Sequence, residues 1–177
     1  RGVGQVPLYY NHKPSGGRSH WYGDYVDMSV RPLYPFGHGL SYTSFAYSDL
    51  QIAPRKPQAH DLVRISVVVT NTGPRAGDEV VQLYVRDTVA SVTRPVQQLV
   101  GFKRLRLQPG ERRTLTFHLA VSQLGFFDAR MRYVVEPGAV VVMVGASCAD
   151  IRQTGCFEIE GPVSEVGEHK VYTTPVE

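Results

Sequence analysis

The sequence is poor in cysteine and contains no long hydrophobic run. Cys148 and Cys156 are the only cysteines among 177 residues, which is too few for a disulfide scaffold, and they lack companions at the spacing of a metal site. They flank a turn between two strand-like stretches, so a cross-strand bridge stays open, although buried free thiols are favoured. No apolar run approaches the roughly 20 residues that a helix needs to cross a bilayer, so we expect no membrane contact of that kind.

The start of the chain also lacks two common signals. Arg1-Gly2-Val3 contains no initiator methionine, and no basic stretch followed by an apolar one comes after it. These residues resemble the interior of a domain. We therefore expect a fragment or a truncated gene product, whose signal peptide, if it has one, would lie upstream.

An excess of charge is missing as well, because the formal net charge is only +3. Basic side chains do gather around a Pro-Gly turn, but leucines rather than stacking aromatic rings lie between them. We predict no nucleic-acid partner and interpret the cluster as the solvated face of a β-hairpin; a contact with an acidic polysaccharide or a membrane surface is the alternative. The cluster consists of Lys103, Arg104, Arg106, Arg112 and Arg113.

Alternation of apolar and polar residues begins after Phe45. Val63, Ile65 and Val67 share one face of an extended stretch, with polar residues between them, which is typical of a half-buried strand. Similar stretches separated by turn residues follow at 81–85, 99–107, 115–119, 133–135, 140–144 and 157–159. Only 121–124 indicates a helical turn. The pattern predicts an all-β protein built as a β-sandwich.

Residues 1–45 show little periodicity and are rich in turn residues, so we expect this part to need another surface on which to lie. The stretch from Leu33 to Phe45, LYPFGHGLSYTSF, places two glycines and a proline among aromatic residues. Glycine permits tight turns and proline fixes φ, so this stretch predicts a rigid, aromatic-anchored connector. We call residues 33–45 the connector.

The connector and five further stretches, at 4–13, 69–85, 94–102, 107–111 and 135–145, resemble in the same order the C-terminal region of glycoside hydrolase family 3 enzymes, such as β-glucosidases and β-xylosidases. In that family the connector closes the second catalytic domain and leads into a fibronectin type III-like domain. The resemblance implies an immunoglobulin or fibronectin type III-like sandwich, preceded by a loop-rich segment from the end of an α/β domain. It implies three parts: residues 1–45, the sandwich at 46–161 and a tail at 162–177.

The resemblance also implies a function and a location. The chain would be the accessory part of a secreted or periplasmic enzyme that removes terminal sugars from oligosaccharides or glycosides. Its partners would be the upstream catalytic domains and, for the whole enzyme, the sugar substrate; a homodimer contact is left open. An independent immunoglobulin-like module that binds carbohydrate or protein, and an inert truncated product, remain the alternatives.

No catalytic residue is predicted in this chain. Family members use an Asp nucleophile and commonly a Glu acid/base, and no position here matches either motif. The carboxyl pairs Asp24/Asp27 and Asp78/Glu79 are interpreted as solvated side chains, the second pair because neighbouring residues of a strand diverge. The histidines lack the spacing of a metal site, so neither a metal nor a cofactor is expected.

Aromatic residues crowd the first quarter of the chain and allow two interpretations. Rings beside amide and charged groups suit a sugar-binding rim, but pinning of the segment to an absent catalytic domain is favoured. The rim candidates are Tyr10, Asn11, Lys13, Arg18 and Trp21. The candidates for interdomain anchors are Tyr34, Phe36, His38, Tyr42 and Phe45, and His38 is expected to pack against Tyr34 or Tyr42.

Overall fold

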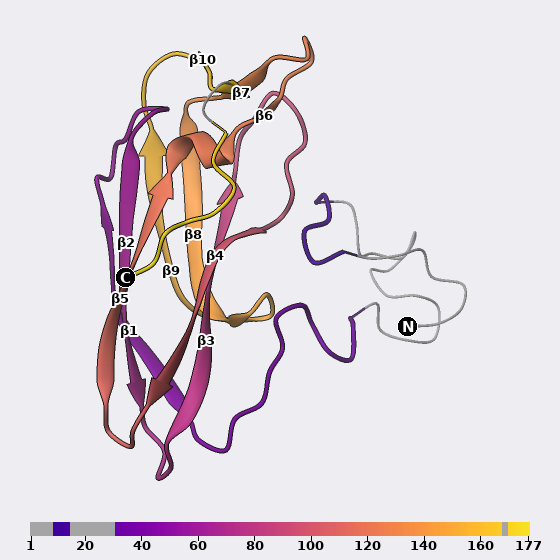
Figure 1. The fold of residues 1–177 in the computed structure, drawn as a ribbon. Helices are drawn as coiled ribbons and strands as arrows, with labels where there is room; N and C mark the ends of the chain where they lie inside the picture. Colours follow the sequence, from indigo (N-terminus) through magenta and orange to yellow (C-terminus); the bar gives the residue numbers. More distant parts are fainter. Residues whose placement is uncertain (1–8, 15–30, 168–169) are drawn as a thin grey trace.

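The computed structural model describes residues 9–14, 31–167 and 170–177. Within them the chain folds into two packed antiparallel sheets (Figure 1), which confirms the predicted β-sandwich. One sheet has the order β1-β2-β5, formed by Phe45–Ala53, Leu62–Asn71 and Arg112–Ala120. The other has the order β4-β3-β8-β9, formed by Gln98–Leu107, Gly77–Asp87, Gly138–Ser147 and Asp150–Ile159.

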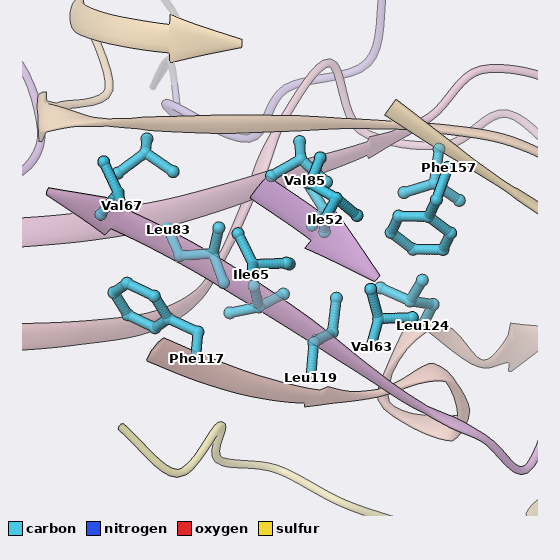
Figure 2. Close-up of a cluster of buried hydrophobic side chains, with 14 of the residues drawn as sticks. Ile52, Val63, Ile65, Val67, Leu83, Val85, Phe117, Leu119, Leu124 and Phe157 are labelled. Carbon is cyan, nitrogen blue, oxygen red and sulfur yellow. The ribbon is translucent and has the colours of Figure 1, made fainter. Parts of the chain in front are cut away.

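The alternating pattern on β2 becomes one wall of the core. Val63, Ile65 and Val67 have no exposed surface, and they face Leu83 and Val85 of the opposite sheet (Figure 2). Full burial of each such side chain contributes about 1.5–3 kcal/mol relative to its exposure. The core between the sheets therefore holds the sandwich together.

Strand β3 departs from the expected alternation in its middle, where residues on both faces are buried. Val81 and Leu83 point into the core, yet Gln82 and Tyr84 on the opposite face are only 4% and 0% exposed. The connector and residues 9–14 cover that outer face, as their contacts below show. A pattern within the strand could not reveal this cover.

The turn after β4 does not make a hairpin, which corrects the interpretation of the basic cluster. β4 pairs with β3 whereas β5 pairs with β2, so the chain crosses from one sheet to the other at residues 108–111. The cluster is divided between the two sheets and is partly neutralised: Arg104 forms an ion pair with Asp78, and Arg113 with Glu111.

Short elements close one end of the sandwich. Val121–Leu124 forms the expected helical turn, a 3-10 helix (η1), and β6 (Phe126–Phe127), β7 (Tyr133–Val135) and β10 (Ser164–Glu165) form a small third sheet. Both cysteines are free, but Cys148 is half-buried and Cys156 exposed, so the expectation of buried thiols is wrong for Cys156. Cys156 lies opposite Val141 in the β8–β9 ladder.

Candidate functional site

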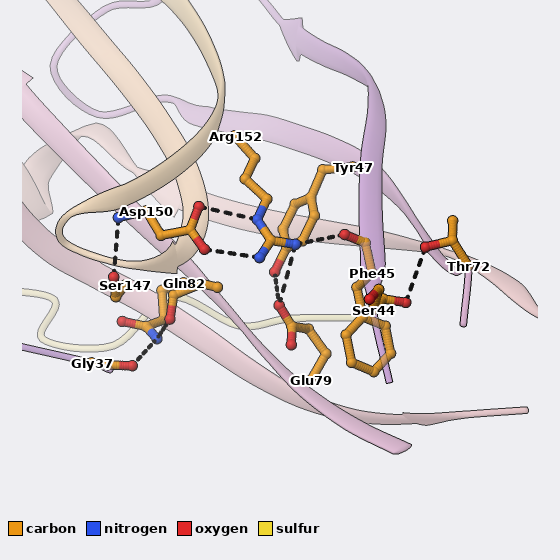
Figure 3. Close-up of polar contacts among 11 residues, drawn as sticks. Gly37, Ser44, Phe45, Tyr47, Thr72, Glu79, Gln82, Ser147, Asp150 and Arg152 are labelled. Atoms are coloured by element: carbon orange, nitrogen blue, oxygen red, sulfur yellow. Dashed lines mark hydrogen bonds and ion pairs between the residues drawn. The ribbon is translucent and has the colours of Figure 1, made fainter. Parts of the chain in front are cut away.

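The connector lies against the outer face of the four-stranded sheet, fixed by the buried amide of Gln82 (Figure 3). Its Nε2 donates to the carbonyl of Gly37, 3.0 Å away, and to that of Ala146, 2.5 Å away. Its Oε1 accepts a hydrogen bond of 2.6 Å from the Tyr84 hydroxyl. Cys148 N–H also donates to the Phe36 carbonyl at 3.0 Å. One amide thus ties the connector to β3 and β8.

Glycine is the only residue type that fits position 37 without strain. Its φ is +81°, in the left-handed region that favours glycine. A Cβ there would lie 2.0 Å from Gln82 Oε1. The glycine that drew notice in the sequence therefore permits close approach to Gln82.

A stack of aromatic rings binds residues 9–14 to the connector. The rings of Tyr10 and Phe36 are parallel, with centroids 4.1 Å apart, and Tyr10 meets Tyr84 edge to face at 6.0 Å. Val96 N–H donates to the His12 carbonyl at 2.8 Å, and Leu99 N–H to the Tyr10 hydroxyl at 3.3 Å. Burial raises the pKa of Tyr84, which keeps its hydroxyl a donor.

Asn71, which has no exposed surface, holds the far end of the connector. Its Oδ1 accepts from the Thr43 hydroxyl at 2.7 Å and from Gly73 N–H at 3.1 Å. Its Nδ2 donates to the carbonyls of Arg75 and Leu107, at 2.7 and 3.0 Å. All hydrogen-bonding positions of the amide are therefore filled.

A charged network lies where the connector enters β1 (Figure 3). The Tyr47 hydroxyl donates to Glu79 Oε1 at 2.7 Å, and Arg152 Nη1 lies 3.9 Å from the same carboxylate. Arg152 also pairs with Asp150 at 2.8 Å, donates to the Phe45 carbonyl at 2.6 Å and lies over the Tyr47 ring, 5.0 Å from its centroid. Strands β1, β3 and β9 are thereby joined.

The environment separates the two neighbouring carboxyls. Burial raises the pKa of Glu79, so the expectation of a solvated side chain is wrong for this residue. The hydrogen bond from Arg104 lowers the pKa of Asp78, which points the other way, as expected for neighbours on a strand. Asp78 is held by Arg104, whereas Glu79 accepts the hydroxyl of Tyr47, so the two neighbouring carboxyls have separate partners.

Between the connector and the sheet runs a groove of about 570 Å³. Aromatic and charged side chains both line it, and its walls include Phe36, Phe102, Asp78, Asp150 and Arg152. The connector also exposes large apolar side chains; Leu40 and Tyr42 are 91% and 90% exposed. We call the exposed side chains of Leu33, Tyr34, Phe36, Leu40 and Tyr42 the connector face.

The structure describes most of the site residues that the sequence predicted, both the candidates for a sugar-binding rim and the candidates for interdomain anchors. Tyr10 is half-buried in the ring stack, whereas Asn11 and Lys13 are exposed; Arg18, Trp21, Asp24 and Asp27 lie outside the described residues. Tyr34 and Tyr42 are exposed, and Phe45 packs against the core. His38 lies against Tyr34, with ring centroids 5.5 Å apart, as expected.

Sequence reasoning missed Gln82, Asn71 and Arg152. Their partners lie far away in the chain, and only Asn71, in an Asn-Thr-Gly-Pro turn, gave a local signal. In the part of the chain that the structure describes, no three His, Cys, Asp or Glu side chains are placed to hold a metal ion. No helix among those residues is long and apolar enough to span a membrane.

The fold and the sequence together identify the class of domain to which the sandwich belongs. Residues 79–148, from β3 to the β8–β9 turn, match the family model of the fibronectin type III-like domain. The chain is 42% identical over 165 residues to a periplasmic β-glucosidase of Salmonella typhimurium, covering 90% of this chain and 21% of that protein. It is 45% identical over 150 residues to a β-xylosidase of Formosa agariphila, covering 83% of this chain and 20% of that protein.

The solved structures agree with the sequences. A β-glucosidase from Listeria innocua, crystallised with glucose, superposes with a TM-score of 0.81 at 34% identity, over 91% of this chain and 23% of that one. The chain thus spans about a fifth of the length of its relatives. The chain is similar to the C-terminal region of family 3 glycoside hydrolases, including the fibronectin type III-like domain.

Proposed function

We propose that this chain is the accessory C-terminal part of a family 3 glycoside hydrolase of the β-glucosidase or β-xylosidase type. It docks on the upstream catalytic domains, stabilises them and shapes the substrate entrance. The observation that carries the proposal is the connector face: Gln82 fixes the connector to the sheet, and the connector still presents Leu40 and Tyr42 to solvent.

The rigidity of the connector supports this role. Gln82 holds its middle and Asn71 its end, so docking would order few further residues. A contact between domains of one chain commonly buries about 600–1,500 Å², and large side chains that are already in place suit such a contact. The division into residues 1–45, 46–161 and 162–177 belongs to the same proposal, with the first part completing the catalytic domain.

The location outside the cytoplasm is also proposed. It is supported by the relative from Salmonella typhimurium, whose name calls it periplasmic. The substrate of the whole enzyme would be an oligosaccharide or glycoside with a terminal sugar, as the names of the β-glucosidase and β-xylosidase relatives suggest.

Hydrolysis of p-nitrophenyl glycosides tests the function. The chain would be assayed alone and after mixing with the separately expressed upstream part of its parent enzyme, on the β-glucoside, β-xyloside and α-arabinoside. We expect no turnover by the chain alone and an increase in the activity or thermal half-life of the upstream part on mixing. Turnover by the purified chain, or an upstream part indifferent to mixing, would contradict the proposal.

The groove favours a second candidate, an independent module that binds carbohydrate. Phe36 and Phe102 offer rings, and Asp78 and Arg152 offer hydrogen-bonding groups within the same 570 Å³, a combination found in sugar sites. Isothermal titration of the chain with cello- and xylo-oligosaccharides separates the two. Heat of binding that is lost in Phe102→Ala would favour the module, and its absence favours the docking role.

A further inference from the structure

Residues 174–177 run along the free edge of β5 as an added strand. Thr116 and Glu177 exchange two backbone hydrogen bonds, of 2.9 and 3.0 Å, and His118 N–H donates to the Pro175 carbonyl at 3.0 Å. Phe117 and Val176 form the antiparallel bridge between them. In Figure 1 the yellow stretch of residues 170–177 runs from the end near β7 and finishes beside β5.

A buried hydroxyl fixes this segment to the opposite sheet. Thr174 is 8% exposed, and its Oγ1 lies 2.8 Å from the carbonyl of Val100 on β4 and 2.9 Å from Gln123 Oε1 on η1. Gln123 Nε2 donates to the same Val100 carbonyl at 3.0 Å. The hydroxyl therefore completes a small polar site built from β4 and η1.

Close packing on Gly101 gives the site its shape. A Cβ at Gly101 would lie 3.0 Å from the Cβ of Thr174 and 3.2 Å from Phe117 Cδ1. The neighbouring Val176 packs against the core, and Lys103 Nζ lies 3.4 Å from its carbonyl. Alternate side chains of the segment, Thr174 and Val176, thus face inward, while Pro175 and Glu177 are directed outward.

These contacts have the two components of strand addition. Backbone hydrogen bonds to a sheet edge supply affinity, and pockets for alternate side chains supply selectivity. β5 and β4 are the edge strands of their sheets, and an uncovered edge is a template for pairing with another chain. We call the free edge of β5 at Thr116–His118, with Val100, Gly101 and Gln123, the edge groove.

We propose that the edge groove is a binding site for an extended peptide segment with the order Thr-Pro-Val, and that residues 174–177 are its resident, separable ligand. The segment closes the edge that would otherwise pair with another chain. No residue of the connector takes part, so this site is independent of the proposed docking role. If the peptide-binding proposal proved wrong, the proposal that the connector face docks on the catalytic domains would still stand.

Peptide binding in trans tests the proposal directly. A variant lacking residues 170–177 would be titrated with a synthetic peptide of that sequence, followed by fluorescence anisotropy. We expect saturable binding, weakened roughly fivefold to tenfold in the Thr174→Val peptide because one buried hydrogen bond is lost, and preserved in Thr174→Ser. A folded variant that binds no peptide, or binds all three alike, would overturn the proposal.

Hydrogen exchange on the full chain tests the same proposal if the shortened variant does not fold. In Thr174→Val we expect the amides of Thr116 and His118 to exchange roughly fivefold to tenfold faster, because the segment opens more often. The amide of Phe117, which alternation directs toward β2, should keep its rate. Equal acceleration of all three amides, or of none, would show that the segment is not separable from the sandwich.

Discussion

The side-chain amide of Gln82 occupies the space that a side chain at position 37 would need. Gln82 Nε2 donates to the Gly37 carbonyl at 3.0 Å, while a Cβ at Gly37 would lie 2.0 Å from Gln82 Oε1. The contact joins residues 45 positions apart, the connector and the middle of β3. The placement of the connector face on the sandwich depends on it.

Gly37→Ala should therefore destabilise the chain by about 2–4 kcal/mol, the sum of a left-handed backbone penalty and overpacking against Gln82. Urea unfolding followed by circular dichroism measures the change. Gly39→Ala is the matched control, since nothing lies within 4 Å of its Cβ position, and it should stay within about 0.5 kcal/mol of the parent. If the two substitutions destabilised the chain equally, the contact between Gly37 and Gln82 would not be what positions the connector.

Asn71→Ala should cost about 3 kcal/mol, because four hydrogen bonds to a fully buried amide are lost and their partners are left behind. Asn71→Asp should be worse at pH 7 than at pH 4, since an ionised carboxylate would face the carbonyls of Arg75 and Leu107. Urea unfolding at both pH values checks this, with the exposed Asn11→Ala as control. A loss in Asn71→Asp that does not change with pH would contradict the assigned contacts.

Glu79 should make stability depend on pH with an unusual sign. Because burial raises its pKa in the folded chain, folding takes up a proton between the unfolded and the folded pKa values. The stability contributed by this group is thus present below the unfolded pKa and is lost as pH rises through the folded pKa. Glu79→Gln should make the free energy of unfolding depend less on pH over that window while keeping an acceptor for Tyr47.

Asp78→Asn supplies the opposite control. The hydrogen bond from Arg104 lowers the pKa of Asp78, so its contribution is present above the unfolded pKa and is lost as pH falls through the folded value. Urea unfolding from pH 3 to 8 should show changes of opposite sign for the two variants, relative to the parent. Changes of the same sign would mean that the environment of Glu79 has been wrongly assigned.

The two thiols should react at different rates. Burial raises the pKa of Cys148, and its side chain is half-buried, whereas Cys156 is exposed. Because the thiolate is the reactive form, an aromatic disulfide reagent at pH 8 should label Cys156 about tenfold or more faster than Cys148. Single Cys→Ser variants assign the two phases, and a parent chain without titratable thiols would show that the cysteines are bridged.

The alternation of apolar and polar residues within a strand correctly predicted which side chains face the core. Val63, Ile65 and Val67 face the core as their alternation indicates, and the helical turn at Val121–Leu124 is present. The cover over Tyr84 was not predicted, because the ring of Tyr10, from a distant part of the chain, supplies it. The same holds for the β4–β5 crossing: a Pro-Gly turn looks alike whether it joins paired strands or strands of opposite sheets.

In the candidate site, too, features with a local sequence signal were predicted and contacts between distant segments were not. The aromatic connector was evident from its composition, whereas Gln82 and Arg152 act through contacts with distant segments and carry no local signal. Glu79 looked like a solvated neighbour of Asp78, although its spacing of two from Val81 places it on the core-facing side of β3. The sequence did not show its partner, the hydroxyl of Tyr47 on β1. Family resemblance supplied the order of the motifs but no information on these polar contacts.

The affinity between this chain and the upstream catalytic part of its parent enzyme tests the docking role most directly. Isothermal titration would compare the parent chain with Leu40→Ser/Tyr42→Ser, and with Leu62→Ser, an exposed apolar residue of β2, as control. We predict at least about tenfold weaker binding for the connector variant with an unchanged melting temperature, and parental affinity for the control. Parental affinity in the connector variant would contradict the assignment of the connector face as the surface that docks on the catalytic domains.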